Sequence, residues 1–271
     1  LASSPTESPL LCGSTVVVGT DAPRCLLQGF DLERGRLLWE EPFAFPALPC
    51  ALDTVLVAAA RGGRVVRLDA ATGARRWETR LPGAGWHPPV LRAAEGQVLV
   101  PVRPDSLLAL DLESGMRLWG KAYGALPWLA AGGEPCAAVT ETGLLLLLDP
   151  LSGEPLARRD LGGVPAGPPL VHGGALWIAL RDGRLLRLAL PDLEIAASLR
   201  LAPPLLAPPA PAGEGVVQAG PRGELRSFDA GGGAVATCHH AEFLLTAPLV
   251  LADRIVAGGA KGTLAAYRRE P

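Results

Sequence analysis

Asparagine does not occur anywhere in this chain of 271 residues, and methionine occurs once. Asparagine is a common oxygen ligand of calcium, so its absence argues against a calcium cluster. The five cysteines show neither a CxxC spacing nor an adjacent pair, which disfavours a zinc site or a disulfide framework. We therefore expect them to pack as small apolar side chains in a reducing compartment. This predicts a cytoplasmic protein, with a periplasmic or extracytoplasmic location as the alternative.

Long apolar runs and an excess of one charge are lacking as well. Even the leucines at 144–148 end at Asp149, and no apolar run is long enough to span a bilayer. The formal net charge is only −2, so we expect neither a membrane span nor a general attraction to nucleic acid. Glycine and proline are abundant, at 33 and 27 residues, but they recur at regular intervals, which is untypical of disorder.

A proline that returns every 38 to 42 residues is the strongest pattern in the sequence. It stands at Pro9, Pro49, Pro89, Pro127, Pro169, Pro209 and Pro248. Repetition at this period, with short β-type runs, is typical of propeller blades. The sequence therefore predicts an all-β fold, a seven-bladed β-propeller of four-stranded antiparallel blades. We expect one propeller domain over residues 1–271, with blades starting near residues 9, 49, 89, 127, 169, 209 and 248.

A second motif follows five of the seven prolines, 20 to 22 residues after each of them. An Asp-x-x-x-Gly element predicts the hairpin between the third and fourth strands, because the carboxylate can accept backbone N–H groups and glycine tolerates positive φ. The expected turn glycines are Gly35, Gly73, Gly115, Gly153 and Gly233. A tryptophan stands eight residues after the first three of these aspartates, and we expect each ring to be buried between neighbouring blades. These rings are Trp39, Trp77 and Trp119.

These repeats resemble those of the quinoprotein-like (PQQ-like repeat) β-propeller superfamily. The resemblance rests on a proline-led inner strand followed by segments such as RLDAATGARRW and ALDLESGMRLW, and it covers nearly the whole chain. The superfamily includes pyrroloquinoline-quinone (PQQ) alcohol dehydrogenases, the assembly lipoprotein of the BAM complex and propeller domains fused to bacterial kinases. Because unrelated functions share this fold, the resemblance implies the fold more strongly than any activity.

The two ends of the sequence suggest how the last blade is completed. The segment after Pro248 supplies three strands and then stops, so we expect the N-terminal residues 1–4 to add the missing strand. That segment is short, and the chain does not begin with methionine. We therefore expect a fragment of a longer chain with a covalently linked upstream domain.

Signals for catalysis are missing from the sequence. There is no HExxH motif, no phosphate-binding loop and no spacing that indicates a nucleophile with its base. Members of the superfamily that use PQQ carry a vicinal disulfide and a calcium cluster, and this chain has neither adjacent cysteines nor asparagine. We therefore expect no enzyme activity and no bound PQQ, calcium or zinc.

Aromatic residues that the repeat does not require stand in the loops before the inner strands. Arginines of the turns between second and third strands should share the same end of the blades. Aromatic and arginine side chains dominate binding energies at interfaces, so this surface is a candidate for a protein or peptide partner. The candidate residues are Phe45, Trp86, His87, Trp128 and Phe243, with Arg61, Arg103, Arg181 and Arg222 around them. Two alternatives remain open: one is that the rings plug the channel instead, and the other is that the propeller binds a small ligand there as a degenerate quinoprotein.

Overall fold

The structure is a computed structural model that describes residues 9–21, 24–130, 135–239, 242, 244, 247–251, 254–258 and 263–268. Within these ranges the regular elements are β-strands, apart from one short 3-10 helix, η1 (Ala93–Glu95). The chain forms two compact units. The first comprises Leu1–Pro127 with Pro150–Glu154, and the second comprises Trp128–Asp149 with Pro155–Pro271.

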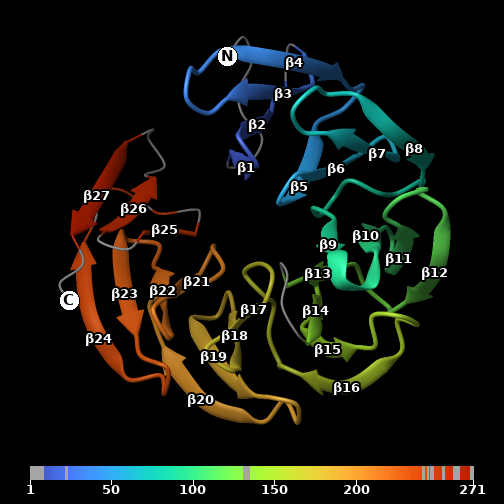
Figure 1. The fold of residues 1–271 in the computed structure, drawn as a ribbon. Helices are drawn as coiled ribbons and strands as arrows, with labels where there is room; N and C mark the ends of the chain where they lie inside the picture. Colours follow the sequence, from blue (N-terminus) through green and yellow to red (C-terminus); the bar gives the residue numbers. More distant parts are fainter. Residues whose placement is uncertain are drawn as a thin grey trace. The chain divides into compact units, whose positions relative to one another are not determined.

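The first unit contains three four-stranded antiparallel sheets, in which the strands of each sheet follow one another in chain order (Figure 1). Blade one is made of β1 (Leu10–Cys12), β2 (Thr15–Gly19), β3 (Leu26–Asp31) and β4 (Leu37–Pro42). Blade two is made of β5 (Ala47–Leu52), β6 (Val55–Ala60), β7 (Arg64–Asp69) and β8 (Arg75–Arg80). Blade three is made of β9 (Val90–Arg92), β10 (Gln97–Val102), β11 (Ser106–Asp111) and β12 (Arg117–Ala122).

The remaining four sheets follow the same plan. Blade four is made of β13 (Pro127–Leu129), β14 (Cys136–Thr140), β15 (Leu144–Leu148) and β16 (Pro155–Asp160). Blade five is made of β17 (Leu170–His172), β18 (Ala175–Ala179), β19 (Arg184–Ala189) and β20 (Ile195–Arg200). Blade six is made of β21 (Ala210–Ala212), β22 (Gly215–Ala219), β23 (Glu224–Phe228) and β24 (Ala234–His239). Blade seven shows β25 (Leu249–Val250), β26 (Arg254–Gly258) and β27 (Leu264–Arg268) among the described residues.

Seven successive up-and-down sheets of this kind are the blades of a β-propeller, so the predicted fold class is confirmed. The expected contribution of residues 1–4 to the last blade lies outside the described residues. Pro49 does not lead its inner strand as the repeat pattern suggested, because it pairs with Ala58 inside β5. β5 is an edge strand, where a residue without an N–H is tolerated.

The second strands of blades three to six explain much of the apolar composition. β10, β14, β18 and β22 are buried along their whole length. Strands buried on both faces consist of nearly continuous apolar residues rather than alternating ones. The fourth strands, by contrast, alternate between exposed and less exposed residues, as β16 and β20 show. The core therefore lies between the blades, and the outer strands separate it from solvent.

The two predicted blade motifs meet each other across the seam between neighbouring blades. Trp77 is 8% exposed, and its indole Nε1 donates to the carbonyl of Leu112 at 2.8 Å, in the hairpin of blade three. A Cβ on Gly115 of that hairpin would lie 2.7 Å from the Trp77 ring, so only glycine leaves room for it. Trp39 with Gly73 and Trp119 with Gly153 repeat the arrangement, although Trp119 is only half-buried. The inter-blade position of these rings is confirmed.

Blades five and six fill the corresponding strand and hairpin positions with other residues. Gly233 was predicted as the positive-φ glycine of blade six, and this is wrong, because Gly232 takes that conformation with φ 92°. A Cβ on Gly232 would lie 3.2 Å from Ala197, which stands at the tryptophan position of blade five. In the hairpin of blade five a buried leucine, Leu193, adopts φ 57° at the position that a glycine takes in blades one to four. It packs in one cluster with Ala157, so a large hairpin residue compensates for a small one on the strand.

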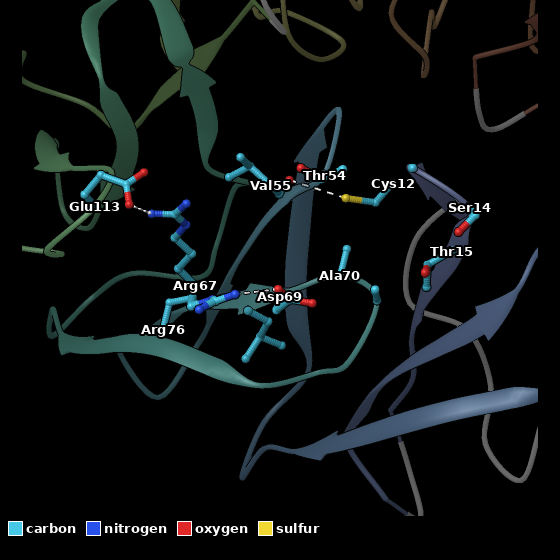
Figure 2. A pocket seen from close by; sticks show the side chains of 13 residues that line it. Cys12, Ser14, Thr15, Thr54, Val55, Arg67, Asp69, Ala70, Arg76 and Glu113 are labelled. Carbon is cyan, nitrogen blue, oxygen red and sulfur yellow. Dashed lines mark hydrogen bonds and ion pairs between the residues drawn. The ribbon is translucent and has the colours of Figure 1, made fainter.

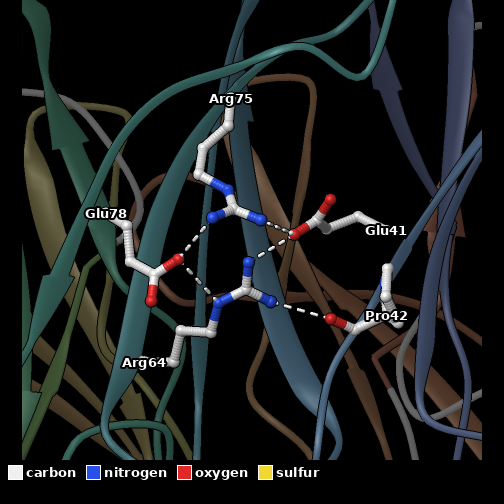
Figure 3. A network of polar contacts seen from close by, with 5 residues as sticks. All are labelled: Glu41, Pro42, Arg64, Arg75 and Glu78. Atoms are coloured by element: carbon white, nitrogen blue, oxygen red, sulfur yellow. Dashed lines mark hydrogen bonds and ion pairs between the residues drawn. The ribbon is translucent and has the colours of Figure 1, made fainter.

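Charged side chains also join blades one and two along their outer strands (Figure 3). Arg64 forms ion pairs with Glu41 and Glu78, and its Nη1 donates to the carbonyl of Pro42 at 2.7 Å. Arg75 contacts the same two carboxylates, at 2.9 and 2.8 Å. These neighbouring carboxylates raise the pKa of Arg64 although partial burial opposes this. Each carboxylate is thus shared by two guanidinium groups, and these four charges are balanced.

Candidate functional site

The candidate site stands at the end of the blades where β5 begins and β6 ends. Ala47 pairs with Ala60 at this end, and Arg64 pairs with Arg80. The loop that leads into each inner strand and the turn between second and third strands therefore lie together. This part of the sequence interpretation holds within the first unit.

The loop between blades two and three is held closely by turns from both blades. The N–H of Arg103 donates to the carbonyl of Gly83 at 3.0 Å, and Ala84 forms a bridge with Val102 of β10. A Cβ on Gly85 would lie 2.1 Å from the backbone carbon of Ala60. Gly85 also has φ 83°, so glycine is required there both by conformation and by space. The next residue, Trp86, is consequently held between the two turns.

Two guanidinium groups contact the ring of Trp86, and we name these three residues the Arg–Trp–Arg cluster. The guanidinium carbon of Arg61, in the β6–β7 turn, lies 4.5 Å from the ring centroid, and that of Arg103, in the β10–β11 turn, lies 4.1 Å from it. Both distances are within the range of a cation–π interaction. Trp86 nevertheless remains 39% exposed, and both arginines are exposed. The cluster therefore combines an accessible ring with two fixed positive charges.

Phe45 extends this surface on the side of blade two. It is 51% exposed, and a Cβ on Gly62 would lie 2.8 Å from its ring, so the ring rests on the β6–β7 turn. Gly62 follows Arg61 directly in the chain. Phe45 and the Arg–Trp–Arg cluster thus form one surface of aromatic and basic side chains.

Two other predicted residues of this set are less accessible. His87 is only 4% exposed, and its Nδ1 lies 2.8 Å from the carbonyl oxygen of Pro127, at the start of β13. This contact anchors the loop that carries Trp86, so His87 is placed to position the ring. Trp128 is half-buried and packs against the core of the second unit.

The remaining predicted residues belong to the second unit. Arg181 and Arg222 are exposed in the β18–β19 and β22–β23 turns, and Phe243 lies outside the described residues. Arg181 corresponds to Arg103, because its N–H donates to the carbonyl of Val164 in the preceding loop at 2.9 Å. That loop, residues 162–168, contains no aromatic residue, and Glu141 stands where blade two has Arg61. The Arg–Trp–Arg cluster is therefore an addition to the blade plan and not part of it.

A cavity of about 500 Å³ lies at the opposite end of the blades in the first unit (Figure 2). Thr54 and Asp69 line it, and Val55 pairs with Asp69 at this end of blade two. Sequence reasoning missed this cavity, since its polar lining comes from turn residues that also stabilise hairpins. The other lining residues come from blades one to three: Cys12, Gly13, Ser14, Thr15, Val55, Arg67, Leu68, Ala70, Ala71, Arg76 and Glu113.

The charges of this cavity are already paired with one another. Arg67 Nη1 lies 2.6 Å from a carboxylate oxygen of Glu113, and Arg76 Nη2 lies 2.7 Å from one of Asp69. The hydrogen bond from Arg76, assisted by one from Thr72, lowers the pKa of Asp69. Burial raises the pKa of the Cys12 thiol to about 11, so this group is protonated at neutral pH. The cavity thus offers neither an unbalanced charge nor an activated nucleophile.

Metal-binding groups and membrane-spanning helices are both absent among the described residues. Within these ranges, no group of three or more histidine, cysteine, aspartate or glutamate side chains is placed to hold a metal ion. The described part of the chain likewise contains no helix that is long and apolar enough to cross a membrane. All five cysteines are described, and each is a thiol.

Comparison with known proteins assigns the family. The sequence model described as outer membrane protein assembly factor BamB matches residues 23–140 and 105–269, which together span most of the chain. The chain belongs to the BamB family. The crystal structure of BamB from Moraxella catarrhalis is similar, with a TM-score of 0.76 and 18% sequence identity over 95% of this chain and 82% of that one. The computationally designed Ika8 protein is also similar, with a TM-score of 0.67 and 14% identity over 99% of this chain and 97% of that one.

These similarities differ in what they contribute. At such low identity, the two solved structures support the fold alone, whereas the family match includes the propeller repeats themselves. No curated protein matches the chain. The resemblance to the PQQ-like repeat superfamily is therefore confirmed, and membership of the BamB family makes it more specific.

Proposed function

We propose that this chain is a non-catalytic interaction module that binds a protein or peptide partner through Phe45 and the Arg–Trp–Arg cluster. The observation that carries the proposal is the exposed ring of Trp86 held beside two arginines. Tryptophan and arginine are enriched among the residues that contribute most to binding at protein interfaces. A ring fixed by its neighbours also loses little conformational entropy when a partner binds.

The family supports this function. The matching family is described as an outer membrane protein assembly factor, and assembly requires contacts between proteins. For the same reason we favour the periplasmic or extracytoplasmic alternative over the cytoplasmic location predicted from the cysteines. The paired charges of the cavity and the protonated thiol of Cys12 provide no support for a catalytic role.

Site-specific photo-cross-linking in living cells tests the proposal. A photoreactive phenylalanine analogue at position 45 should give one discrete adduct with a partner protein. The matched control is the same analogue at Met116, which is 70% exposed in the β11–β12 hairpin at the other end of blade three. We expect no discrete adduct there. Equal adducts from both positions, or none from position 45, would contradict the proposed function.

A further inference from the structure

We infer that the Arg–Trp–Arg cluster recognises an acidic segment of a protein partner. Its carboxylates would bind Arg61 and Arg103, and an apolar side chain next to them would pack on Phe45 and the exposed part of Trp86. The inference rests on the proposed function and specifies the chemistry of its ligand. It is carried by the charges, spacing and orientation of these side chains.

Arg61 differs from the nearby Arg64 in its ion-pair partners. Arg64, three residues later, has carboxylates of Glu41 and Glu78 as partners, whereas Arg61 has no ion pair or side-chain hydrogen bond with any of the described residues. A second guanidinium group, that of Arg103, contacts the same ring. Two like charges close together repel each other, and an anionic segment that binds both would relieve that repulsion. The cluster thus brings two guanidinium groups to one exposed ring of the first unit.

The spacing of the two arginines suits one short segment. Their guanidinium carbons are less than about 9 Å apart, because both lie near one ring centroid, at 4.5 and 4.1 Å. Carboxylate side chains two positions apart in an extended peptide share one face and can span such a distance. A guanidinium group that contacts a ring with its face keeps N–H groups at its edge for bidentate bonds to a carboxylate. The ring therefore orders both arginines before the ligand arrives.

The surroundings favour a peptide over a nucleic acid. Proteins that bind nucleic acids usually neutralise a row of phosphates, whereas the formal charge of this chain is −2 and the cluster provides two cations. Phosphate sites commonly use backbone N–H groups, but this surface is made of side chains. The exposed ring of Phe45 beside the cluster matches an apolar residue of a peptide.

Selection from a library of short random peptides displayed on phage, carried out against the whole chain, tests the inference. We expect the enriched peptides to carry aspartate or glutamate residues two positions apart. Replacing both arginines (Arg61→Gln with Arg103→Gln) should weaken binding of a synthetic enriched peptide by about tenfold or more, the loss of a charge-assisted hydrogen bond. Added salt should weaken binding further. The matched control, Arg158→Gln, changes an exposed arginine on the outer strand β16 and should leave the affinity unchanged.

The possible results separate the inference from the proposed function. The inference is wrong and the proposed function stands in two cases. In the first, enriched peptides do not bind Trp86→Ala but lack acidic residues. In the second, they do not bind Trp86→Ala but bind the double arginine variant as tightly as the unaltered protein. If every enriched peptide binds Trp86→Ala and the double variant normally, the binding surface lies elsewhere and both are wrong. Failure to enrich any peptide, or recruitment by phosphatidylglycerol vesicles through Arg61 and Arg103 without peptide binding, overturns the inference. In those two cases the cross-linking from position 45 decides the proposed function independently.

Discussion

The guanidinium carbon of Arg103 lies 4.1 Å from the centroid of the Trp86 ring, although the two residues come from different loops of the blade plan. The contact exists because the N–H of Arg103 donates to the carbonyl of Gly83, three residues before the ring. The same backbone contact recurs in blade five, so it belongs to the blade repeat. Between blades two and three it positions Trp86 and Arg103, two side chains that the repeat does not require. This separates the structural role of the turn from the binding role of its side chains.

Trp77→Ala should destabilise the protein by about 3–5 kcal/mol, the usual loss for a large core side chain. The ring is buried between blades, and the change also leaves the carbonyl of Leu112 without its indole donor. Urea titration measures the free energy of unfolding. A loss below about 1 kcal/mol would show that the ring does not hold the blades together.

Gly115→Ala should be more destabilising than Gly35→Ala. Both glycines have similar φ, 71° and 63°, so either replacement carries about 1–2 kcal/mol of backbone strain. A Cβ at Gly115 would additionally collide with Trp77, whereas a Cβ at Gly35 would meet no atom within 4 Å. The urea midpoints of the two variants isolate this collision, which overpacking data place at about 1–3 kcal/mol. Equal midpoints would contradict the packing of Trp77 on Gly115.

Asp69→Asn should weaken the dependence of the melting temperature on pH in the acid range. Because the pKa of Asp69 is lowered in the folded state, its carboxylate contributes stability above the ordinary value of 3.8, and this contribution is lost as the pH falls through the lowered pKa. Asparagine keeps an oxygen for the N–H of Thr72 but cannot pair with the charge of Arg76. Melting temperatures measured from neutral pH down to acid should therefore converge for the two proteins. Curves that stay parallel would contradict this role.

The sequence predicts the blade framework well because the residues that form each hairpin lie close together in the chain. An aspartate that caps a hairpin and a glycine with positive φ act within a few residues, and the carboxylate of Asp111 indeed accepts the N–H of Ser114 at 2.7 Å. The role of Leu193 was not predictable from its own blade. It is determined by the small residue Ala157 on the preceding blade, which periodicity alone does not connect with it.

The candidate site was predictable only as a group of residues at one end of the blades. The sequence places Trp86 and His87 side by side in one loop, yet the ring of Trp86 is exposed and that of His87 is buried against Pro127. Similarly, the pairing of Arg61 and Arg103 on one ring depends on how closely Gly85 approaches Ala60. Such approaches between blades involve residues far apart in the chain.

The effect of Trp86→Ala on the cross-link from position 45 tests the central claim most directly. Since Trp86 is 39% exposed, we expect its loss to lower the melting temperature less than Trp77→Ala does. The account predicts that the partner adduct disappears while the variant remains folded and melts cooperatively. An adduct that persists at full yield, or a variant that loses the adduct only because it unfolds, would contradict the claim that this ring binds the partner.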